Sequence, residues 1–404
     1  MKKILLAIAS LAVLCSCAQK VELTKSGIDP KDFDSEYNGA KTALYTLTNA
    51  NGMEVCVTNF GGRIVSVMVP DVNGEFKDVV LGFDKVCDYF PENNLSDFGA
   101  SIGRYANRIK AGEFTLDGQT YTLPKNNNGN CLHGGFKGWQ YAVYETVESS
   151  ANSVKLKLVS PDGDNGFPGE VTAFVTFTLT EGNAIDIAYE ATADKATVIN
   201  MTNHSYFNLS GDPANHSVVD DYMMVNSCCF TPTDELLIPT GEIACLEGTP
   251  LDFKQPKRIG DRIDEIEFEP VAFAGGYDHN WILCNKGDIT VPAAAVVCPE
   301  SGIAMNVYTD EPGIQIYSGN FLDGTVTGKK GVVYNKRAAI CLESQHYPDT
   351  PNQPEWPSVV LRPGETYTSH CIYEFGVVKP CCLEKIMGGE ACNDDCCSEG
   401  KCEK

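Results

Sequence analysis

Short runs of β-branched and aromatic residues, each closed by a turn signal, recur along most of this 404-residue chain. Examples are KLKLVS (155–160), VTAFVTFTLT (171–180) and AIDIAYEATA (184–193), and turns such as LDGQTY (116–121) lie between such runs. Alternation of apolar and polar residues with a period of two is typical of antiparallel strands. Because no sustained helical periodicity, linker or repeat interrupts residues 37–378, the sequence predicts one large all-β domain there, a β-sandwich or a distorted barrel.

The first 36 residues differ from this domain. MKKILLAIASLAVLCSC places Lys2 and Lys3 before an apolar run over 4–14 that is too short to span a bilayer, which is typical of an export signal. LCSC at 14–17 resembles a bacterial lipobox, which predicts a signal peptide over 1–17 and lipidation of Cys17. An ordinary signal peptide is the alternative. We expect a polar tether over 18–36 and an exported protein that faces the periplasm or cell envelope and touches the membrane only through its lipid anchor.

The 18 cysteines are unevenly distributed, with six of them in the last segment, 379–404. Their spacing there lacks the paired C-x-x-C motifs of a zinc site, so we expect a mobile tail rather than a metal centre. Cysteines of the central domain, such as Cys56 and Cys298, are embedded in apolar runs. Such thiols behave as small hydrophobic side chains, and a chain of this length does not need disulfides to fold.

The overall charge argues against nucleic acid as a partner. With 54 acidic and 31 basic residues the formal net charge is -23, which repels phosphate backbones. The sequence also contains no H-E-x-x-H, G-x-S-x-G, Walker or G-x-G-x-x-G motif, so zinc hydrolases, serine esterases and nucleotide-binding proteins lose their usual support. A neutral small molecule is the expected ligand, and no metal or other cofactor is expected.

His204 lies in VINMTNHSYFNLSG (198–211), which the alternation predicts to be a strand. Asn200, Thr202, Tyr206 and Asn208 would share its face, and apolar residues would fill the other face. One reading is a solvated outer face. The other is that this polar face lines a ligand cleft.

Glu343 stands out because AAICLESQ (338–345) is otherwise apolar around it. Burial there would raise the pKa of its carboxyl group toward the range useful to a general base. An exposed glutamate on an edge strand is the alternative. In GGYDHNW (275–281), alternation predicts that His279 is a hydrogen-bonded core histidine and that Asp278 points to the opposite face.

Further polar groups occur in other segments. His133 precedes two glycines, which would let the backbone approach a ligand closely. Arg108 either pairs with a surface carboxylate or holds sugar hydroxyls with its guanidinium group. Three other histidines are interpreted as surface or packing residues: His216, His346 and His370. Together with nearby tyrosines and Trp139, this inventory suits a sugar, whose hydroxyls need many short hydrogen bonds.

The order of these motifs resembles the aldose 1-epimerase (galactose mutarotase) family. The resemblance rests on DVVLGFD, GRYANRIKAGEFTLDGQTYTL, LHGG, NHSYFNLSG, IPTGE, TPLDF, GGYDHNW and GIQIYSGNFLDGT, in that order. It spans about Tyr45 to Phe375, and the ordered series is far more specific than any single motif. It implies a galactose mutarotase-like "supersandwich", a large β-sandwich with an open cleft on one sheet.

The resemblance also implies roles for individual residues. His204 corresponds to the general acid that protonates the ring oxygen, and Glu343 to the base that takes the proton of the C1 hydroxyl. The family's sugar-binding positions fall on Asn107, Arg108, His133, Asp278 and Gln315. The substrate is then an aldohexose such as glucose or galactose, with acid and base facing each other across a pocket as wide as a hexose.

Three other activities are weighed against this one. The first is a catalytically silent sugar-binding lipoprotein with the same fold. The second is a glycosidase that uses Asp278 and Glu343 as a carboxylate pair, which would leave the histidine without a role. The third, an epimerase of phosphorylated hexoses, is disfavoured because the expected cleft offers a single obvious arginine.

Overall fold

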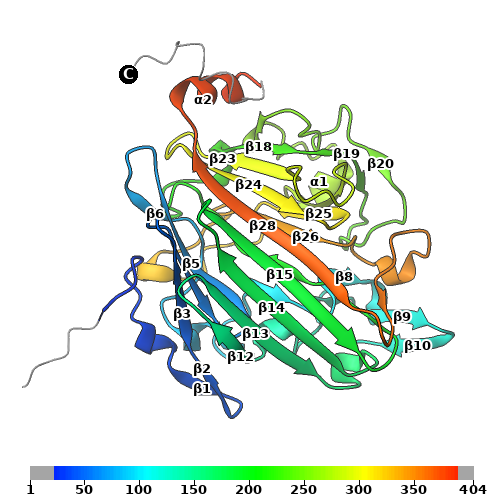
Figure 1. Ribbon diagram of the computed structural model, residues 1–404. Coiled ribbons are helices and arrows are strands. Elements are labelled where there is room, and N and C mark those ends of the chain that lie inside the picture. The colour runs from blue at the N-terminus through cyan, green and yellow to red at the C-terminus, as the bar shows by residue number, and fades with distance from the viewer. Residues whose placement is uncertain (1–21, 390–404) are drawn as a thin grey trace, which may run out of the picture.

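The computed structural model describes residues 22–389. β-Strands dominate it, and three sheets of nine, five and four strands form most of the molecule. In Figure 1 the nine-stranded sheet runs across the front, from β12 through β28 to β18, and the blue four-stranded sheet lies at its left. Two short α-helices occur in the described residues, α1 (Glu269–Ala274) and α2 (Pro380–Met387).

The nine-stranded sheet is antiparallel throughout. Its strands, in spatial order, are β12 (Glu145–Ser149), β13 (Ser153–Ser160), β14 (Val171–Leu179), β15 (Ala184–Ala193), β28 (Tyr367–Val377), β24 (Ile303–Thr309), β23 (Ala294–Val297), β18 (Tyr222–Val225) and β21 (Lys257–Arg258). Every second residue of β14 is buried, as the alternation in the sequence predicts. One face of this sheet therefore packs on the core while the other is more open.

The two smaller sheets cover the inner face of the large one. The five-stranded sheet has the order β20 (Ala244–Cys245), β19 (Ser227–Thr231), β22 (Asp278–Leu283), β25 (Gly313–Tyr317) and β26 (Cys341–Gln345). The four-stranded sheet has the order β3 (Leu44–Thr48), β4 (Glu54–Thr58), β5 (Arg63–Pro70) and β6 (Phe76–Asp78). Side chains from all three sheets share one hydrophobic core, which confirms the predicted β-sandwich.

Five two-stranded sheets complete the described strands. They pair β1 (Ser35–Tyr37) with β2 (Ala40–Thr42), β9 (Glu113–Leu116) with β10 (Gln119–Thr122), β8 (Arg108–Ile109) with β11 (Cys131–Leu132), β16 (Thr197–Val198) with β27 (Val360–Leu361), and β7 (Ala100–Ile102) with β17 (Thr202–His204).

Strands β25 and β26 are buried on both faces. Ile314, Ile316 and Leu342 point into the shared core. Their neighbours along the chain, Gln315 and Glu343, therefore face the other way. A strand whose second face is also covered can hold polar side chains away from water. This second face of the five-stranded sheet is where the predicted site residues gather.

The ends of the domain differ from the sequence-based boundaries. Ile28 and Phe33 are buried in an apolar cluster, so the packed structure begins before residue 37, within the predicted tether. At the other end, part of the predicted tail forms helix α2, in which Cys382 is buried. Residues 1–21, with the predicted signal peptide and Cys17, lie outside the described residues. Nowhere in 22–389 is a helix long and apolar enough to cross a bilayer.

The segment around His204 is not the long half-exposed strand that alternation predicts. Within 198–211, Val198 ends β16 and Thr202–His204 forms β17, a three-residue strand that pairs with β7. Both of its faces are buried, because β17 packs against β26 as well as against β7. The solvated-face reading of His204 is therefore wrong.

The ten cysteines of the central domain that the sequence treats as small hydrophobic residues are all free thiols. Cys56 and Cys298 are fully buried in the apolar clusters, as their sequence context predicts. Three others are exposed, at positions 228, 245 and 284.

Candidate active site

Three neighbouring strands bring two carboxylates and two amides onto one face. Gln315 of β25 lies directly opposite Glu343 of β26 and Asn280 of β22. Asp278 lies two residues before Asn280 and so points to the same face. Gln315 Nε2 donates a hydrogen bond to Asp278 Oδ1 at 2.7 Å. The register of the sheet therefore fixes the spacing of these groups.

His204 reaches the same face from β17. Its Nε2 lies 3.6 Å from Glu343 Oε1, and the two side chains are only 7% and 2% exposed. The other polar atoms of the pair, His204 Nδ1 and Glu343 Oε2, have no hydrogen-bond partner within the described protein. Buried polar atoms without partners are rare and need an explanation. A ligand hydroxyl could satisfy both atoms.

Burial sets the protonation state of this pair. Burial raises the pKa of Glu343 well above its ordinary value, and the charges of Asp278 and Asp97 raise it further, while Arg108 opposes them. Burial lowers the pKa of His204 to about 3. Burial thus favours the neutral form of both groups, a protonated carboxyl group beside a neutral imidazole.

The Asn107–Arg108 segment connects the remaining predicted residues. Asn107 N–H donates to His133 Nδ1 at 3.1 Å, so the proton of a neutral His133 ring is on Nε2. Asn107 Oδ1 accepts from Arg108 N–H at 2.8 Å and from its Nη1 at 3.3 Å. Arg108 Nη2 lies 4.0 Å from Asp278 Oδ2. Arg108 is thus buried beside a site carboxylate, and the reading as a surface ion pair is wrong.

The first glycine after His133 allows a close approach between two backbone segments. A Cβ at Gly134 would lie 2.2 Å from the carbonyl oxygen of Gly103, and Gly134 has φ +78°. Gly134 thus packs against the backbone of the GRYANRI segment. It fixes that segment, which carries Asn107 and Arg108, against His133.

Sequence reasoning missed one residue of the site, Asp97, while Tyr206 is a residue that the alternation already places on the face of His204. Asp97 precedes β7, and its carboxylate and the ring nitrogens of His133 and His204 all lie within 4.8 Å of one another. Burial raises the pKa of Asp97 to about 6, although the charge of Arg63 opposes this. The Tyr206 ring stacks on His204, with centroids 5.0 Å apart. Nothing in SDFGA (96–100) marks Asp97, so only the fold could reveal it.

Not all of the predicted polar face lines the site. Asn200 Nδ2 donates to the carbonyl of His346, and Asn208 Nδ2 donates to the carbonyls of His216 and Ala338. These amides hold loops in place instead. His279 is the predicted core histidine: it is fully buried, and its Nε2 lies 3.0 Å from the Pro270 carbonyl.

The three histidines interpreted as surface or packing residues all pair with carboxylates. His346 Nδ1 lies 2.6 Å from Glu311, and His370 Nδ1 lies 3.1 Å from Asp186. His216 is buried, with Nε2 2.8 Å from Asp221 and Nδ1 2.9 Å from Glu300. Each of these histidines thus has a carboxylate partner of its own, in line with the interpretation as surface or packing residues.

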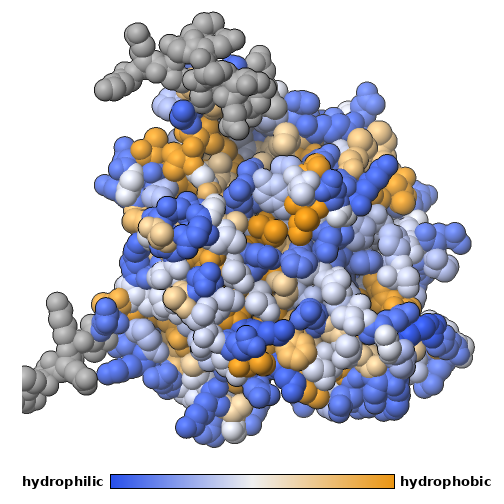
Figure 2. Space-filling view, viewed as in Figure 1, coloured by the Kyte–Doolittle hydropathy of each residue, from blue (hydrophilic) through white to orange (hydrophobic). Residues whose placement is uncertain are grey.

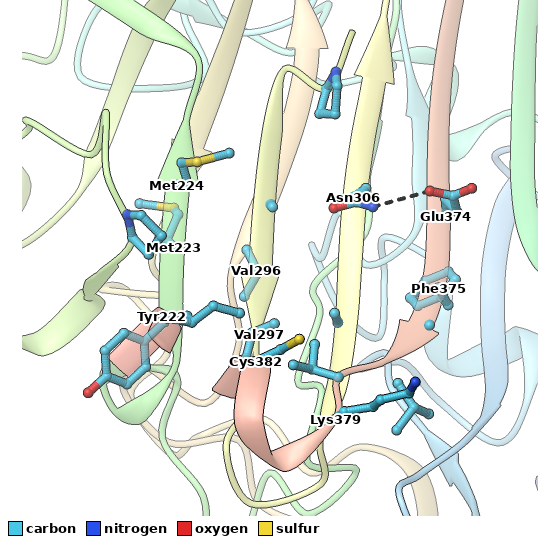
Figure 3. A pocket seen from close by; sticks show the side chains of 18 of the residues that line it. Tyr222, Met223, Met224, Val296, Val297, Asn306, Glu374, Phe375, Lys379 and Cys382 are labelled. Carbon is cyan, nitrogen blue, oxygen red and sulfur yellow. Dashed lines mark hydrogen bonds between the residues drawn. The ribbon is translucent and has the colours of Figure 1, made fainter. Parts of the chain in front are cut away.

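A separate hollow of about 740 Å³ lies on the outer face of the nine-stranded sheet. Figure 3 shows Met223, Met224 and Val296 on its floor and Cys382 of α2 at its edge. In the space-filling view, apolar patches gather in the upper half of this face, near α2. The hollow contains none of the predicted site residues, so its size does not make it the active site.

Comparison with known proteins places this arrangement in a family. The family model described as aldose 1-epimerase matches residues 43–374. Galactose mutarotase of Bos taurus is 41% identical, with 84% of this chain and 96% of that protein covered, and aldose 1-epimerase of Escherichia coli (strain K12) is 38% identical with the same coverage. A C. elegans aldose epimerase homologue has a similar structure, with 30% identity, a TM-score of 0.75, and 84% and 100% of the two chains covered. The chain belongs to the aldose 1-epimerase family.

Proposed function

We propose that His204 and Glu343 move the protons in the reaction of this family, the interconversion of the α and β anomers of aldoses. The protein is accordingly an isomerase. The residue assignment rests on the buried pair, in which His204 Nε2 lies 3.6 Å from Glu343 Oε1. Each of the two side chains also has a buried polar atom without a hydrogen-bond partner in the described protein. Aldohexoses such as glucose and galactose are the proposed substrates.

The short separation indicates where the pair acts. It is less than the width of a hexose, so the two groups do not face each other across the ring as the sequence analysis expects. The C1 hydroxyl and the ring oxygen are bonded to the same carbon. Two groups this close together suit these two oxygens at the anomeric end of the sugar.

Glu343 takes the proton of the C1 hydroxyl while His204 protonates the ring oxygen, and the ring opens to the aldehyde. Rotation about the C1–C2 bond exposes the other face of the aldehyde, and reclosure with the protons moving in reverse gives the other anomer. This step begins with a protonated His204 and an ionised Glu343. Burial favours the opposite placement of the proton in the free site, on Glu343 rather than His204, so substrate binding must shift that proton within the pair.

The remaining residues hold the sugar so that only its anomeric end can turn. Asp278 accepts and Arg108 donates hydrogen bonds to hydroxyls, and His133 offers Nε2–H because its Nδ1 is already occupied. Gln315 Oε1 is buried without a partner and accepts from a further hydroxyl. Asn107 positions Arg108 through its side-chain oxygen.

Polarimetry of freshly dissolved α-D-galactose and α-D-glucose tests the assignment. We expect His204→Asn and Glu343→Gln each to slow enzymatic mutarotation by about 10²- to 10⁴-fold, the usual contribution of a positioned acid or base. His370→Asn is the matched control, because that histidine is half-exposed and pairs with Asp186 instead. Wild-type rates in both site variants would refute the roles, and a wild-type protein that leaves the spontaneous rate unchanged would indicate a silent sugar-binding protein.

We also propose that the protein is an exported lipoprotein anchored through Cys17. The support is the basic, apolar and lipobox-like sequence of residues 1–17. In a bacterial host, labelled palmitate should enter the wild-type protein and not Cys17→Ser. Equal labelling of the two, or none in either, would refute the anchor.

A further inference from the structure

Two exposed thiols lie against each other on the five-stranded sheet. Cys228 Sγ and Cys284 Sγ are 3.5 Å apart, and both side chains are open to solvent. Cys228 belongs to β19, at the irregularity where the register with β22 shifts between Ser227 and Cys229. Cys284 directly follows β22, and its backbone N–H donates to the Asn226 carbonyl at 2.9 Å. The backbone thus holds the two thiols side by side.

We propose that Cys228 and Cys284 are the site of a disulfide that joins β19 to β22 in the oxidised protein. A disulfide needs its two sulfur atoms about 2.05 Å apart and side chains that point toward each other. The second condition is already met, and the first needs a movement of about 1.5 Å, which rotation of two exposed side chains supplies. Neither thiol is enclosed by packed residues that would resist this movement.

Two further observations favour oxidation of this pair. Cys381 and Cys382 of α2 are already disulfide-bonded, so the chain carries oxidised cysteines elsewhere. The export signal would place the protein in an oxidising compartment, and this second argument depends on the export proposed above. The buried cysteines of the central domain lack access to an oxidant, whereas Cys228 and Cys284 are both exposed and already lie 3.5 Å apart.

The chemistry is a thiol–disulfide exchange with a disulfide oxidant, either oxidised glutathione or a thiol–disulfide oxidoreductase. Both thiols are open to solvent, and we write the exchange with Cys228 as the first nucleophile. Its thiolate attacks the oxidant disulfide and releases one thiolate. The Cys284 thiolate then attacks Cys228 Sγ and releases the second. The pair loses two electrons and two protons, and the oxidant gains them as two thiols.

The disulfide stabilises the fold rather than switching the reaction on or off. It closes a loop between residues 56 positions apart and fixes the far end of β22, the strand that begins with Asp278. Cys284 follows the end of β22, whereas Asp278 lies at the start of the strand. In the loop-closure model a loop of this length gives a substantial stabilisation, so oxidation should raise Tm by about 5 °C and leave the mutarotation rate unchanged.

The test compares the full-length protein with Cys228→Ser and Cys284→Ser after treatment with oxidised glutathione. Free thiols are alkylated under native conditions, and unreduced peptides are mapped by mass spectrometry. We expect one peptide pair linked through Cys228 and Cys284 and lighter by two hydrogen atoms. The increase in Tm should be present in wild type, reversed by dithiothreitol and lost in both variants.

Cys245→Ser is the matched control, because Cys245 is also exposed and lies on β20, beside the same strand. It should keep the full increase in Tm. The difference between wild type and Cys228→Ser is the relevant quantity, because it isolates this pair from every other cysteine of the chain. The proposal fails if Cys228 and Cys284 remain alkylatable in the oxidised, active protein. It also fails if either is linked to a different cysteine, or if Cys228→Ser keeps the increase.

Discussion

Replacing Asp278 with asparagine removes one negative charge from the site and changes its shape very little. Asp278 is buried, accepts a hydrogen bond from Gln315 Nε2 at 2.7 Å and lies 4.0 Å from Arg108 Nη2. Asparagine still offers Gln315 an oxygen. A sugar hydroxyl that donates to a carboxylate gains about 1.5–3 kcal/mol, and one that donates to a neutral amide gains about 0.5–1.5 kcal/mol.

The difference of about 1–1.5 kcal/mol corresponds to a 5- to 10-fold increase in KM, with kcat changed much less. Asp278→Ala should cost more, because it leaves Gln315 Nε2 and the guanidinium of Arg108 without their partner. Loss of a partner for a buried charged group costs about 3 kcal/mol or more of folding stability, so Asp278→Ala should also lower Tm, while KM rises at least as much as in Asp278→Asn. The two variants thus separate the effect of charge from that of pairing.

The pH profile gives a second readout. The pair of His204 and Glu343 works with one shared proton, which it loses as the pH rises through the raised pKa of Glu343. The negative charge of Asp278 helps to keep that pKa high, so asparagine lowers it. The alkaline limb of kcat/KM should therefore move to lower pH in Asp278→Asn.

Initial rates of mutarotation, measured by polarimetry from pH 5 to 10, provide both readouts. Asp117→Asn is the charge-matched control, since Asp117 is an exposed residue that pairs with Arg362 on the surface. An alkaline limb that stays in place or moves to higher pH in Asp278→Asn would refute the electrostatic argument. A wild-type KM in both Asp278 variants would refute its role in holding the sugar.

Three other substitutions test separate parts of the structure. Asp97→Asn should remove a step in kcat/KM near pH 6, where burial places the pKa of this carboxyl group, and an unchanged step would exclude Asp97 from the site. Burial lowers the pKa of His216, but hydrogen bonds to Asp221 and Cys298 outweigh burial and raise this pKa from 6.5 to about 11. The protonated ring therefore stabilises the fold fully below pH 6.5, and this stabilisation is lost as the pH rises toward 11. The Tm advantage of wild type over His216→Gln should shrink across that window, and a constant advantage would contradict the linkage. Gly103→Ala places a Cβ 2.1 Å from Trp139 Cε3, so Tm should fall by several °C, corresponding to about 1–3 kcal/mol, and an unchanged Tm in thermal unfolding would contradict this packing.

The strands of the large sheet could be predicted because the alternation of buried and exposed side chains has a period of only two residues. In β14 every second residue is buried against the core, which is the pattern that the sequence itself displays. Around His204 the same reasoning failed. The segment from 198 to 211 alternates between polar and apolar residues, but other strands and loops cover both of its faces. The polar residues there form hydrogen bonds inside the protein and are not exposed to solvent.

The candidate residues of the site could be found from the sequence because burying a charged or polar group in an apolar strand costs free energy unless the group has a partner or a function. Glu343 within AAICLESQ is such a case, and its burial and raised pKa follow the prediction. Asp97 had no such signal, since its surroundings in the sequence are polar and irregular. Its position beside two histidines depends on β7 pairing with β17.

The sequence by itself determined the strand pattern, the family and the types of group available for proton transfer, because these depend on residue identity and on periods of a few positions. Only the tertiary structure decided that His204 and Glu343 lie 3.6 Å apart rather than a hexose width apart. It also decided that Cys228 and Cys284 touch. Both contacts join segments that are distant along the chain, and their distances are set by sheet register and by the packing of one layer on another, which no local pattern encodes.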